Sequence, residues 1–313
     1  MTTSDPREYQ EGPRLRKRGR PGSIRAATTL AAVIVSLPAQ LPDFIRTETG
    51  QRYAISGIAF VRHVGAGSQF LVAHDNRGPG ENRLALVTLG SRVTYTPVPW
   101  PPGKPLPGDL ESLSSLPGAP GRYVTSTSDG TVSLLELTGD TVALRGAFTL
   151  PARPPLPNFE GLSVQRVNGQ LIIAWGQRGA GPQPAVLFWG TFDPDRLLVT
   201  GVSSVTITVP FPSPQSPDTR HIADIKIDSA GAVLISSTND PGDDGPFQSA
   251  LYLAGRFLVS GDAVTFEPRV PLAREGSFPG HKVEAIELME NEREVVLGTD
   301  DEHQGGAVAV FPR

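Results

Sequence analysis

The sequence contains no cysteine, which excludes disulfides, zinc–thiolate sites and thiol nucleophiles and leaves the redox compartment undetermined. No apolar run reaches the roughly 18 residues of a membrane helix, so we expect no membrane span. Acids and bases are interspersed at a net charge of −4, without the basic surface or the arginine–aromatic platforms that bind nucleic acid. We therefore expect no membrane span and no nucleic-acid partner.

Several catalytic motifs are also missing. There is no G-x-S-x-G elbow and no phosphate-binding loop, so the sequence signals neither a standard serine hydrolase nor a nucleotide enzyme. The segment DPGDDG, which begins at Asp240, is similar to a calcium-binding loop. However, Gly242 and Leu251 stand where that loop requires ligands. We interpret this segment as a turn between strands.

The chain does contain many turns and a recurring hairpin. Its 31 prolines and 34 glycines make about a fifth of 313 residues, which is turn-rich but below the range of low-complexity disorder. The segment NFEGLSVQRVNGQLIIAWGQRG, from Asn158 to Gly179, begins with an acid-led apolar strand. A turn at Asn168-Gly169 separates it from a second strand that ends in polar residues. This pattern predicts a β-hairpin.

The hairpin occurs five times, and each full copy carries two further strands before a proline-rich passage leads to the next. One apolar position in the first strand serves as a marker, and the markers are Ile58, Leu113, Leu162, Ile225 and Ile286. Four strands per unit of roughly 50 to 60 residues are typical of a propeller blade. The sequence therefore predicts an all-β, five-bladed β-propeller with four-stranded blades.

The fifth copy lacks a fourth strand, and a candidate lies near the N-terminus at residues 28–42. A strand there would complete the last blade and remove the open edges of the ring. We thus expect a propeller domain over residues 26–313, after a disordered basic tail over 1–25. The alternative is a signal peptide, because a basic stretch precedes an apolar one. The closing strand favours a cytoplasmic protein, and the signal peptide favours a secreted one; in either case we expect a monomer.

The heads of the first strands, the ends of the second strands and the passages between blades share one face of a propeller. Ionisable side chains gather at these positions. The heads carry Glu111, Glu160 and Glu284, with Ser56 and Ala223 in the other two blades. The ends of the second strands carry Asp75, Asp129, Arg178, Asp240 and Asp301, and the passages add Arg220, His221 and His281.

Glutamates that face one axis repel one another unless a positive group lies between them or some of them hold protons. We expect a calcium ion bound by Glu111, Glu160, Glu284, Asp75 and Asp301, because calcium accepts a flexible set of oxygen ligands. A cationic ligand is one alternative. In another, the acids cap turns or pair with Arg178, Arg220 and Lys282. Glu287 and its neighbours fall on the opposite face, where we expect them to be solvated.

The order of these segments resembles an uncharacterised family of bacterial propellers, a domain of unknown function. The resemblance rests on ISGIAF with FLVAHDN, DLESLS with YVTSTSDG, NFEGLS followed by Arg178, RHIADIKI, and VEAIEL with VLGTDDE. It covers nearly the whole chain from Ile55. The chain departs from the pattern at Ser112, where glycine would stand, and after Arg178, which lacks a following proline. More distantly, the acid-led first strands look like those of calcium-dependent lactonase propellers, and the layout is similar to esterase-like phytase propellers.

These relatives imply metal-dependent hydrolysis of a small ester, lactone or phosphoester in the central channel. His221 or His281 would act as general base, and Arg178 or Arg220 would orient an anionic substrate. Ser56 with one of these histidines is a less favoured nucleophile–base pair. Two alternatives stay open: a non-catalytic propeller that binds a ligand or a protein, and a small-molecule cyclase or isomerase that uses the same funnel.

Overall fold

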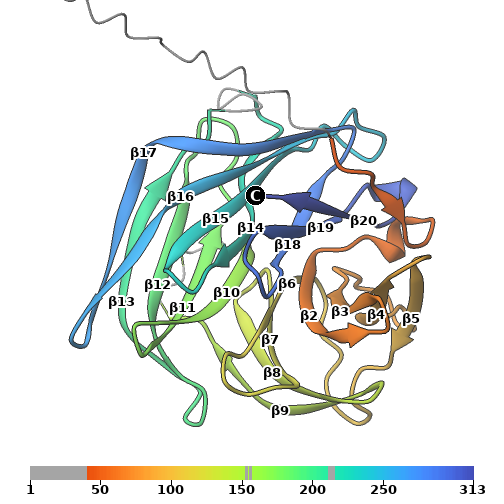
Figure 1. The fold of residues 1–313 in the computed structure, drawn as a ribbon, viewed down its shortest axis with the longest axis horizontal. Helices are drawn as coiled ribbons and strands as arrows, with labels where there is room; N and C mark the ends of the chain where they lie inside the picture. Colours follow the sequence, from red (N-terminus) through yellow and green to blue (C-terminus); the bar gives the residue numbers. More distant parts are fainter. Residues whose placement is uncertain (1–40, 152–153, 155–156, 211–215) are drawn as a thin grey trace, which may run out of the picture. The chain divides into compact units, whose positions relative to one another are not determined.

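Five four-stranded antiparallel sheets surround a central axis in the computed structural model (Figure 1). The structure describes residues 41–313 except 152–153, 155–156 and 211–215. The predicted five-bladed β-propeller is confirmed. Within the described residues, no helix has the length and apolar character needed to cross a membrane.

Each blade uses consecutive strands of the chain, except the last. Blade 1 consists of β2 (Gly57–Val64), β3 (Gly67–Ala73), β4 (Leu84–Leu89) and β5 (Thr94–Val98). Blade 2 consists of β6 (Leu110–Ser115), β7 (Arg122–Thr127), β8 (Thr131–Thr138) and β9 (Thr141–Thr149). Blade 3 consists of β10 (Phe159–Val167), β11 (Gln170–Gln177), β12 (Ala185–Asp193) and β13 (Leu198–Ile207). Blade 4 consists of β14 (Thr219–Ile227), β15 (Ala232–Asn239), β16 (Gln248–Ser260) and β17 (Ala263–Pro279). Blade 5 consists of β18 (Val283–Leu288), β19 (Glu294–Thr299), β20 (Ala307–Pro312) and β1 (Ile45–Arg46).

An N-terminal strand closes blade 5. The sequence predicted this, because its fifth repeat lacks a fourth strand. The strand is β1, whose Ile45 and Arg46 pair with Val308 and Ala307 of β20. It lies downstream of the expected segment: residues 28–40 and the expected tail over 1–25 are outside the described residues, and residues 41–42 belong to no strand. Backbone bonding fixes the position of β1, because the Thr47 amide also donates to a carbonyl next to β20.

The first strands β2, β6, β10, β14 and β18 contact one another in a closed circle around the channel. Some of these contacts are backbone against backbone. A Cβ on Gly57 would lie 2.6 Å from the carbonyl carbon of Ser112, so this close approach requires glycine. Hydroxyls also tie neighbouring blades together, since the Ser163 Oγ accepts a bond of 3.0 Å from the Ile227 amide. The channel wall is therefore a closely packed ring.

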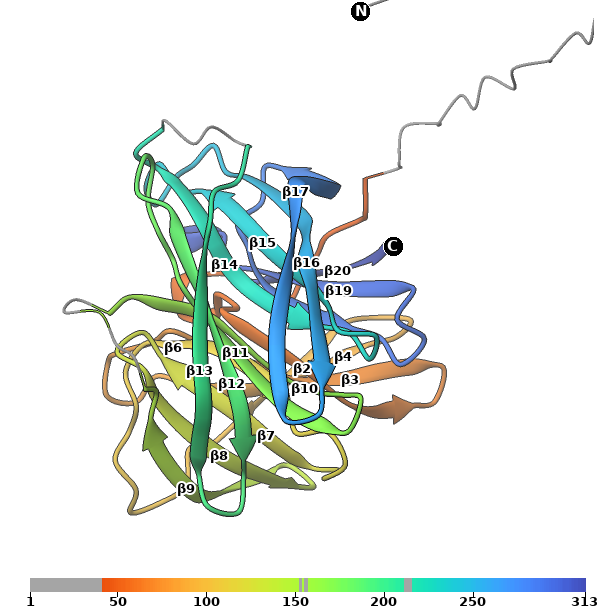
Figure 2. The same cartoon turned by 90° about the vertical axis from the view of Figure 1, so that its left-hand side faces the viewer.

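The core lies between successive blades and consists mainly of buried Ile, Val, Leu and aromatic side chains. Trp175 stacks on Phe188 at 5.6 Å, and Trp189 contacts Phe257 at 5.6 Å. Both tryptophans thus serve packing within and between blades. The long hairpins β12–β13 and β16–β17 that carry several of these rings are prominent in Figure 2.

Candidate functional site

The three glutamates at the strand heads all lie at β-bulges. Pairing of first with second strand shifts register between Leu110 and Ser112, between Phe159 and Leu162, and between Val283 and Ala285. Glu111, Glu160 and Glu284 thus lie where the ladder is interrupted. Bulges commonly re-aim side chains beside functional sites. Here they place all three carboxyls around a single cavity.

This cavity has a volume of about 650 Å³ and is lined by charged and polar residues from all five blades or their connections. Its described lining contains ten carboxylic acids, four basic side chains and no aliphatic or aromatic side chain. The acids are Asp75, Glu81, Asp109, Glu111, Glu160, Asp240, Asp243, Glu284, Asp300 and Glu302, and the bases are Arg52, Arg77, Arg178 and Lys282. The predicted convergence of Glu111, Glu160, Glu284, Asp75 and Arg178 on one face therefore agrees with this geometry.

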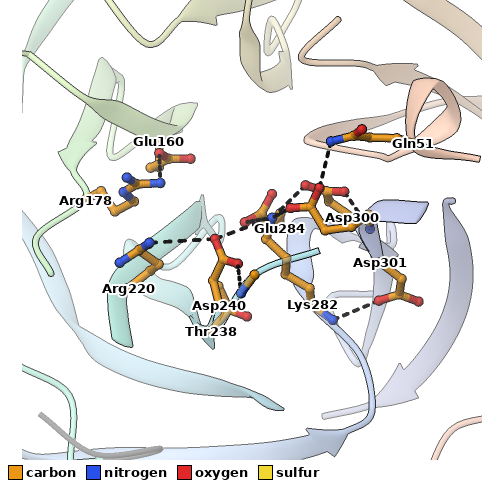
Figure 3. Close-up of polar contacts among 12 residues, drawn as sticks. Gln51, Glu160, Arg178, Arg220, Thr238, Asp240, Lys282, Glu284, Asp300 and Asp301 are labelled. Carbon is orange, nitrogen blue, oxygen red and sulfur yellow. Dashed lines mark hydrogen bonds and ion pairs between the residues drawn. The ribbon is translucent and has the colours of Figure 1, made fainter. Parts of the chain in front are cut away.

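Lys282 supplies the positive charge on one side of the cavity (Figure 3). Its buried Nζ lies 2.8 Å from Asp300, 3.4 Å from Glu284 and 3.7 Å from Asp240, and it also contacts Glu302. Burial alone would lower the pKa of Lys282, but the surrounding carboxylates outweigh burial and raise it. This side of the cavity is a four-carboxylate site with an ammonium already in it.

The rest of the cavity has less positive charge. Arg178 Nη1 lies 3.2 Å from Glu160 Oε1, while among the described residues no lysine or arginine forms an ion pair with Glu111 or Asp75. Burial, and then the charge of Glu160, raise the pKa of Glu111 well above its usual value. Burial and the charge of Asp300 raise the pKa of Asp75 to about 7. Burial and repulsion therefore favour the protonated form of Glu111, and the pKa of Asp75 lies near neutral pH.

Glu111 and Glu160 hydrogen-bond to each other through their side chains. Burial also raises the pKa of Glu160, but Arg178 and then Lys282 oppose this effect by favouring its ionised form. Two hydrogen-bonded carboxyls titrate as a unit that retains one proton over a wide pH range. Of the two, Glu160 is the one whose charge Arg178 favours.

Two residues expected at the site lie beside the cavity rather than in it. Asp301 is fully buried; it accepts a bond of 2.9 Å from the Lys282 amide and pairs with His281 Nδ1 at 2.8 Å. The neighbouring Asp300 lines the cavity instead. His281 stacks on Phe44 at 3.9 Å and borders a separate pocket near the N-terminal strand. These contacts do not place His281 within reach of the glutamates' cavity.

The other two predicted residues have structural contacts. Both ring nitrogens of His221 bond to the backbone, at 2.7 Å to the Gly181 carbonyl and 3.3 Å to the Val209 amide. Burial lowers the pKa of this histidine. Arg220 lies behind the cavity wall and pairs with Asp240 at 3.7 Å. The general-base role expected for His221 and the anion-binding role expected for Arg220 gain no support from these positions.

The calcium ion expected from the sequence was tested against the donor set. Within the described residues, no group of three or more His, Asp or Glu side chains is arranged to hold a metal ion. The Lys282 ammonium lies between Glu284 and Asp300, and Asp301 faces away from the cavity. The residues as arranged do not fit a calcium ion shared by the five expected ligands, and calcium at this site stays a prediction.

At the opposite end of the channel, the environment of Glu287 differs from what the sequence predicted. Glu287, expected to be solvated, is 6% exposed, and its Oε2 lies 2.7 Å from Lys226 Nζ. Lys226 also donates to the Leu113 carbonyl at 3.1 Å. The expectation was wrong because β18 and β14 are neighbours in the ring, so that a lysine from one blade reaches a glutamate from the next.

Sequence reasoning missed Asp109, Asp300, Glu302 and Arg77 as lining residues. Asp109 directly precedes the strand head at Leu110, and that adjacency was an available signal. Asp300 and Asp301 are adjacent, and the sequence offered no means of choosing between them. Trp100 lines a neighbouring pocket.

No family model and no curated protein sequence matches the chain. Solved structures with a similar fold include a family GH43 endo-arabinanase from Bacillus licheniformis, at 12% identity and a TM-score of 0.47 over 86% of this chain and 96% of that one. A thermostable family-43 glycoside hydrolase has 10% identity and a TM-score of 0.47 over 85% and 91%. The glutaminyl cyclase of Myxococcus xanthus has 12% identity and a TM-score of 0.44 over 88% and 97%. The propeller fold of this chain rests on its own sheet topology, and the bacterial family resembled in sequence stays a prediction.

Proposed function

We propose that the acidic cavity is the active site of a hydrolase that acts on a small neutral or positively charged ester or lactone. The observation that carries this proposal is the buried, hydrogen-bonded pair Glu111–Glu160 at the wall of an open cavity. Carboxyl pairs whose environments drive their pKa values apart are the usual basis for separate acid and base roles.

The two glutamates differ in the way that such chemistry needs. Arg178 opposes the effect of burial on Glu160 and favours its ionised form, which suits Glu160 to the role of base. Glu111 has no cationic partner among the described residues, and burial keeps it protonated, which makes it the acid. A direct hydrogen bond also brings the carboxyls closer than the roughly 5 Å or more that separates the two carboxylates of a glycosidase. The pair therefore favours hydrolysis with a water molecule held between the carboxyls and the substrate carbonyl.

In this mechanism, Glu160 removes a proton from water as the water oxygen attacks the carbonyl carbon. Glu111 gives its proton to the leaving oxygen as the carbon–oxygen bond of the ester breaks. The products are an acid and an alcohol, or a hydroxy acid from a lactone. Glu160 then holds a proton and Glu111 is ionised, and transfer along their shared hydrogen bond restores the starting state.

The charge of the cavity restricts the substrate. Ten acids against four bases repel phosphoesters and carboxylates, and the field favours neutral or cationic molecules. Arg178 is engaged by Glu160 and Arg220 by Asp240, so neither arginine is free to orient an anion. This removes phosphoesters from the classes expected from the sequence.

A non-catalytic binding protein for an amine is the second candidate. The observation that favours it is the environment of Lys282, whose ammonium is accepted by four carboxylates in the cavity wall. A ligand ammonium could find similar partners at Asp75 and Glu111. Cyclase or isomerase chemistry would use the same acid–base pair. The proton transfers would then rearrange the bound molecule instead of cleaving it with water.

The test is hydrolysis of a panel of p-nitrophenyl esters and lactones by wild type, Glu111→Gln, Glu160→Gln and the control Asp243→Asn. Asp243 is exposed and lines the same cavity. We expect each glutamine variant to lower kcat by at least about 100-fold, the usual contribution of a general acid or base, with an unchanged melting temperature. The control should retain wild-type kcat. Wild-type activity in Glu160→Gln would overturn the proposal, whereas binding of amines without turnover would favour the second candidate.

A further inference from the structure

A second pocket adjoins the acidic cavity and has the opposite chemical character. Its volume is about 480 Å³, and Trp100, Leu106, Leu144 and Ala147 contribute apolar side chains to its wall. Arg77 and Asp109 line both spaces. The apolar pocket and the acidic cavity therefore meet at Arg77 and Asp109.

The shared border combines a fixed residue with a movable one. Asp109 has a φ of 65°, a left-handed conformation that is costly for a residue other than glycine and is often retained at functional positions. The Ser128 hydroxyl donates to its Oδ2. The Arg77 Nε donates to its Oδ1 at 2.9 Å, yet the Arg77 side chain is 75% exposed. Exposed ion pairs contribute little free energy, so Arg77 can move aside at small cost while Asp109 stays in place.

The walls of the apolar pocket are held in position by the fold. The Trp100 indole donates a hydrogen bond of 3.0 Å to the Pro105 carbonyl, which ties together the loop that carries Leu106. Trp100 and Leu144 also pack against the hydrophobic core shared by blades 1 and 2. Leu106 remains 45% exposed. The pocket is thus formed without a ligand, and its apolar surface stays open to solvent.

We propose that this pocket is the subsite for the apolar part of a substrate whose positively charged head lies in the acidic cavity. The substrate class is then an amphiphile, such as an amine or an amino ester with an alkyl or aryl group. The choice of occupant rests on continuity, because Arg77 and Asp109 belong to both spaces, and on charge, because the acidic cavity attracts the cationic end. The inference rests on the proposed function for the placement of the head, but its test needs no turnover.

The test uses a series of n-alkylammonium ions, from methyl to octyl, with affinity measured by calorimetry. For wild type we expect affinity to rise about twofold to fourfold per methylene once the tail enters the apolar pocket, which is the gain for burying one CH₂ group wholly or in part. Ala147→Trp fills the pocket from the exposed face of β9. This variant should keep the affinity for methylammonium and lose the dependence on chain length.

Thr206→Trp is the matched control, because Thr206 is an exposed residue on β13, the corresponding outer strand of blade 3. It should behave like wild type. Equal affinity for all chain lengths in wild type would overturn the subsite and leave the hydrolase proposal standing. A chain-length gain that survives in Ala147→Trp would place the tail elsewhere and also overturn it. Failure of every amine to bind would exclude the cationic head, while hydrolysis of neutral esters would still decide the proposed function independently.

Discussion

The two ends of the central channel each contain a buried lysine, and the two sites differ in charge balance. At one end, Lys226 pairs with Glu287 at 2.7 Å and donates to a backbone carbonyl of a neighbouring blade. At the other, Lys282 contacts four carboxylates at the wall of a cavity that contains six more. A lysine that forms one ion pair and bonds to the backbone of another blade suits a structural tie, although buried Asp224 also lies in its field. The much larger excess of acids around Lys282 does not suit such a tie.

The excess of acid is costly for the folded state and therefore indicates a function. Burial and mutual repulsion raise the pKa values of Glu111, Glu284 and Asp75, so the free protein retains protons that ordinary carboxylates would release. At the Lys226 end, Glu287 already has its cation, and the amides of Ile225 and Ile286 donate to the buried Asp224. An unbalanced site attracts positive charge and keeps acids protonated near neutral pH, as proton transfer requires.

The largest expected effect on stability is at the Lys226–Glu287 pair. Lys226→Met leaves Glu287 buried without its partner, and we expect the free energy of unfolding to fall by about 3 to 5 kcal/mol. The double variant Lys226→Met/Glu287→Leu should recover most of this loss, because the buried Glu287 carboxylate is then removed together with its partner. Urea denaturation measures both values. A loss below about 1 kcal/mol in the single variant would show that this lysine is not a structural tie.

Lys282→Met should lower the free energy of unfolding less than Lys226→Met does, by about 1 to 3 kcal/mol. The reason is that the carboxylate partners of Lys282 border an open cavity that water and salt cations can enter. The raised pKa of Lys282 means that its contribution is fully present at neutral pH and is lost only in strong alkali. Removing it leaves repulsion among Asp240, Glu284 and Asp300, which protonation relieves. The loss should therefore be larger at pH 8 than at pH 5, and equal losses at both would contradict this account.

Asp75→Asn tests the acidic end without removing a cation. Because the pKa of Asp75 is raised to about 7, the folded protein holds a proton that the unfolded chain releases near its ordinary pKa of about 4. The associated stability is present below about pH 4 and is lost as pH rises through about 7. Asparagine does not ionise, so the variant does not lose this stability. The melting temperature of the variant minus that of wild type should therefore increase from pH 5 to pH 8. Asp140→Asn, in an exposed turn, should follow wild type at every pH.

The smallest expected effect is that of removing divalent cations. Since Lys282 lies among the carboxylates that a metal would use, a calcium chelator should change the melting temperature by less than about 1 °C. Differential scanning calorimetry with and without chelator, with metal analysis of the purified protein, measures this. A fall of several degrees together with about one calcium per chain would establish the calcium site expected from the sequence.

Local pattern was enough to predict the architecture. The period of the hairpins predicted five blades and four strands per blade, and the Asn168-Gly169 turn predicted the hairpin of β10 and β11. Asn168 and Gly169 have φ values of 45° and 91°, as a tight hairpin turn requires. The same pattern predicted that Glu111, Glu160 and Glu284 lie on one face, because equivalent positions of successive blades are equivalent in space.

The ion-pair and strand partners, in contrast, come from different parts of the ring and could not be predicted from local sequence. Lys226 and Glu287 belong to different blades, and β1 closes the ring against β20 from the other end of the chain, so no local signal could pair them. Asp300 and Asp301 differ by one position, yet only Asp300 lines the cavity, because adjacent residues at a strand end point in different directions. The sequence determined the repeat and the acids at the strand heads. Tertiary structure decided which acids share a proton and which receive a cation, because charge balance is a property of neighbours in space.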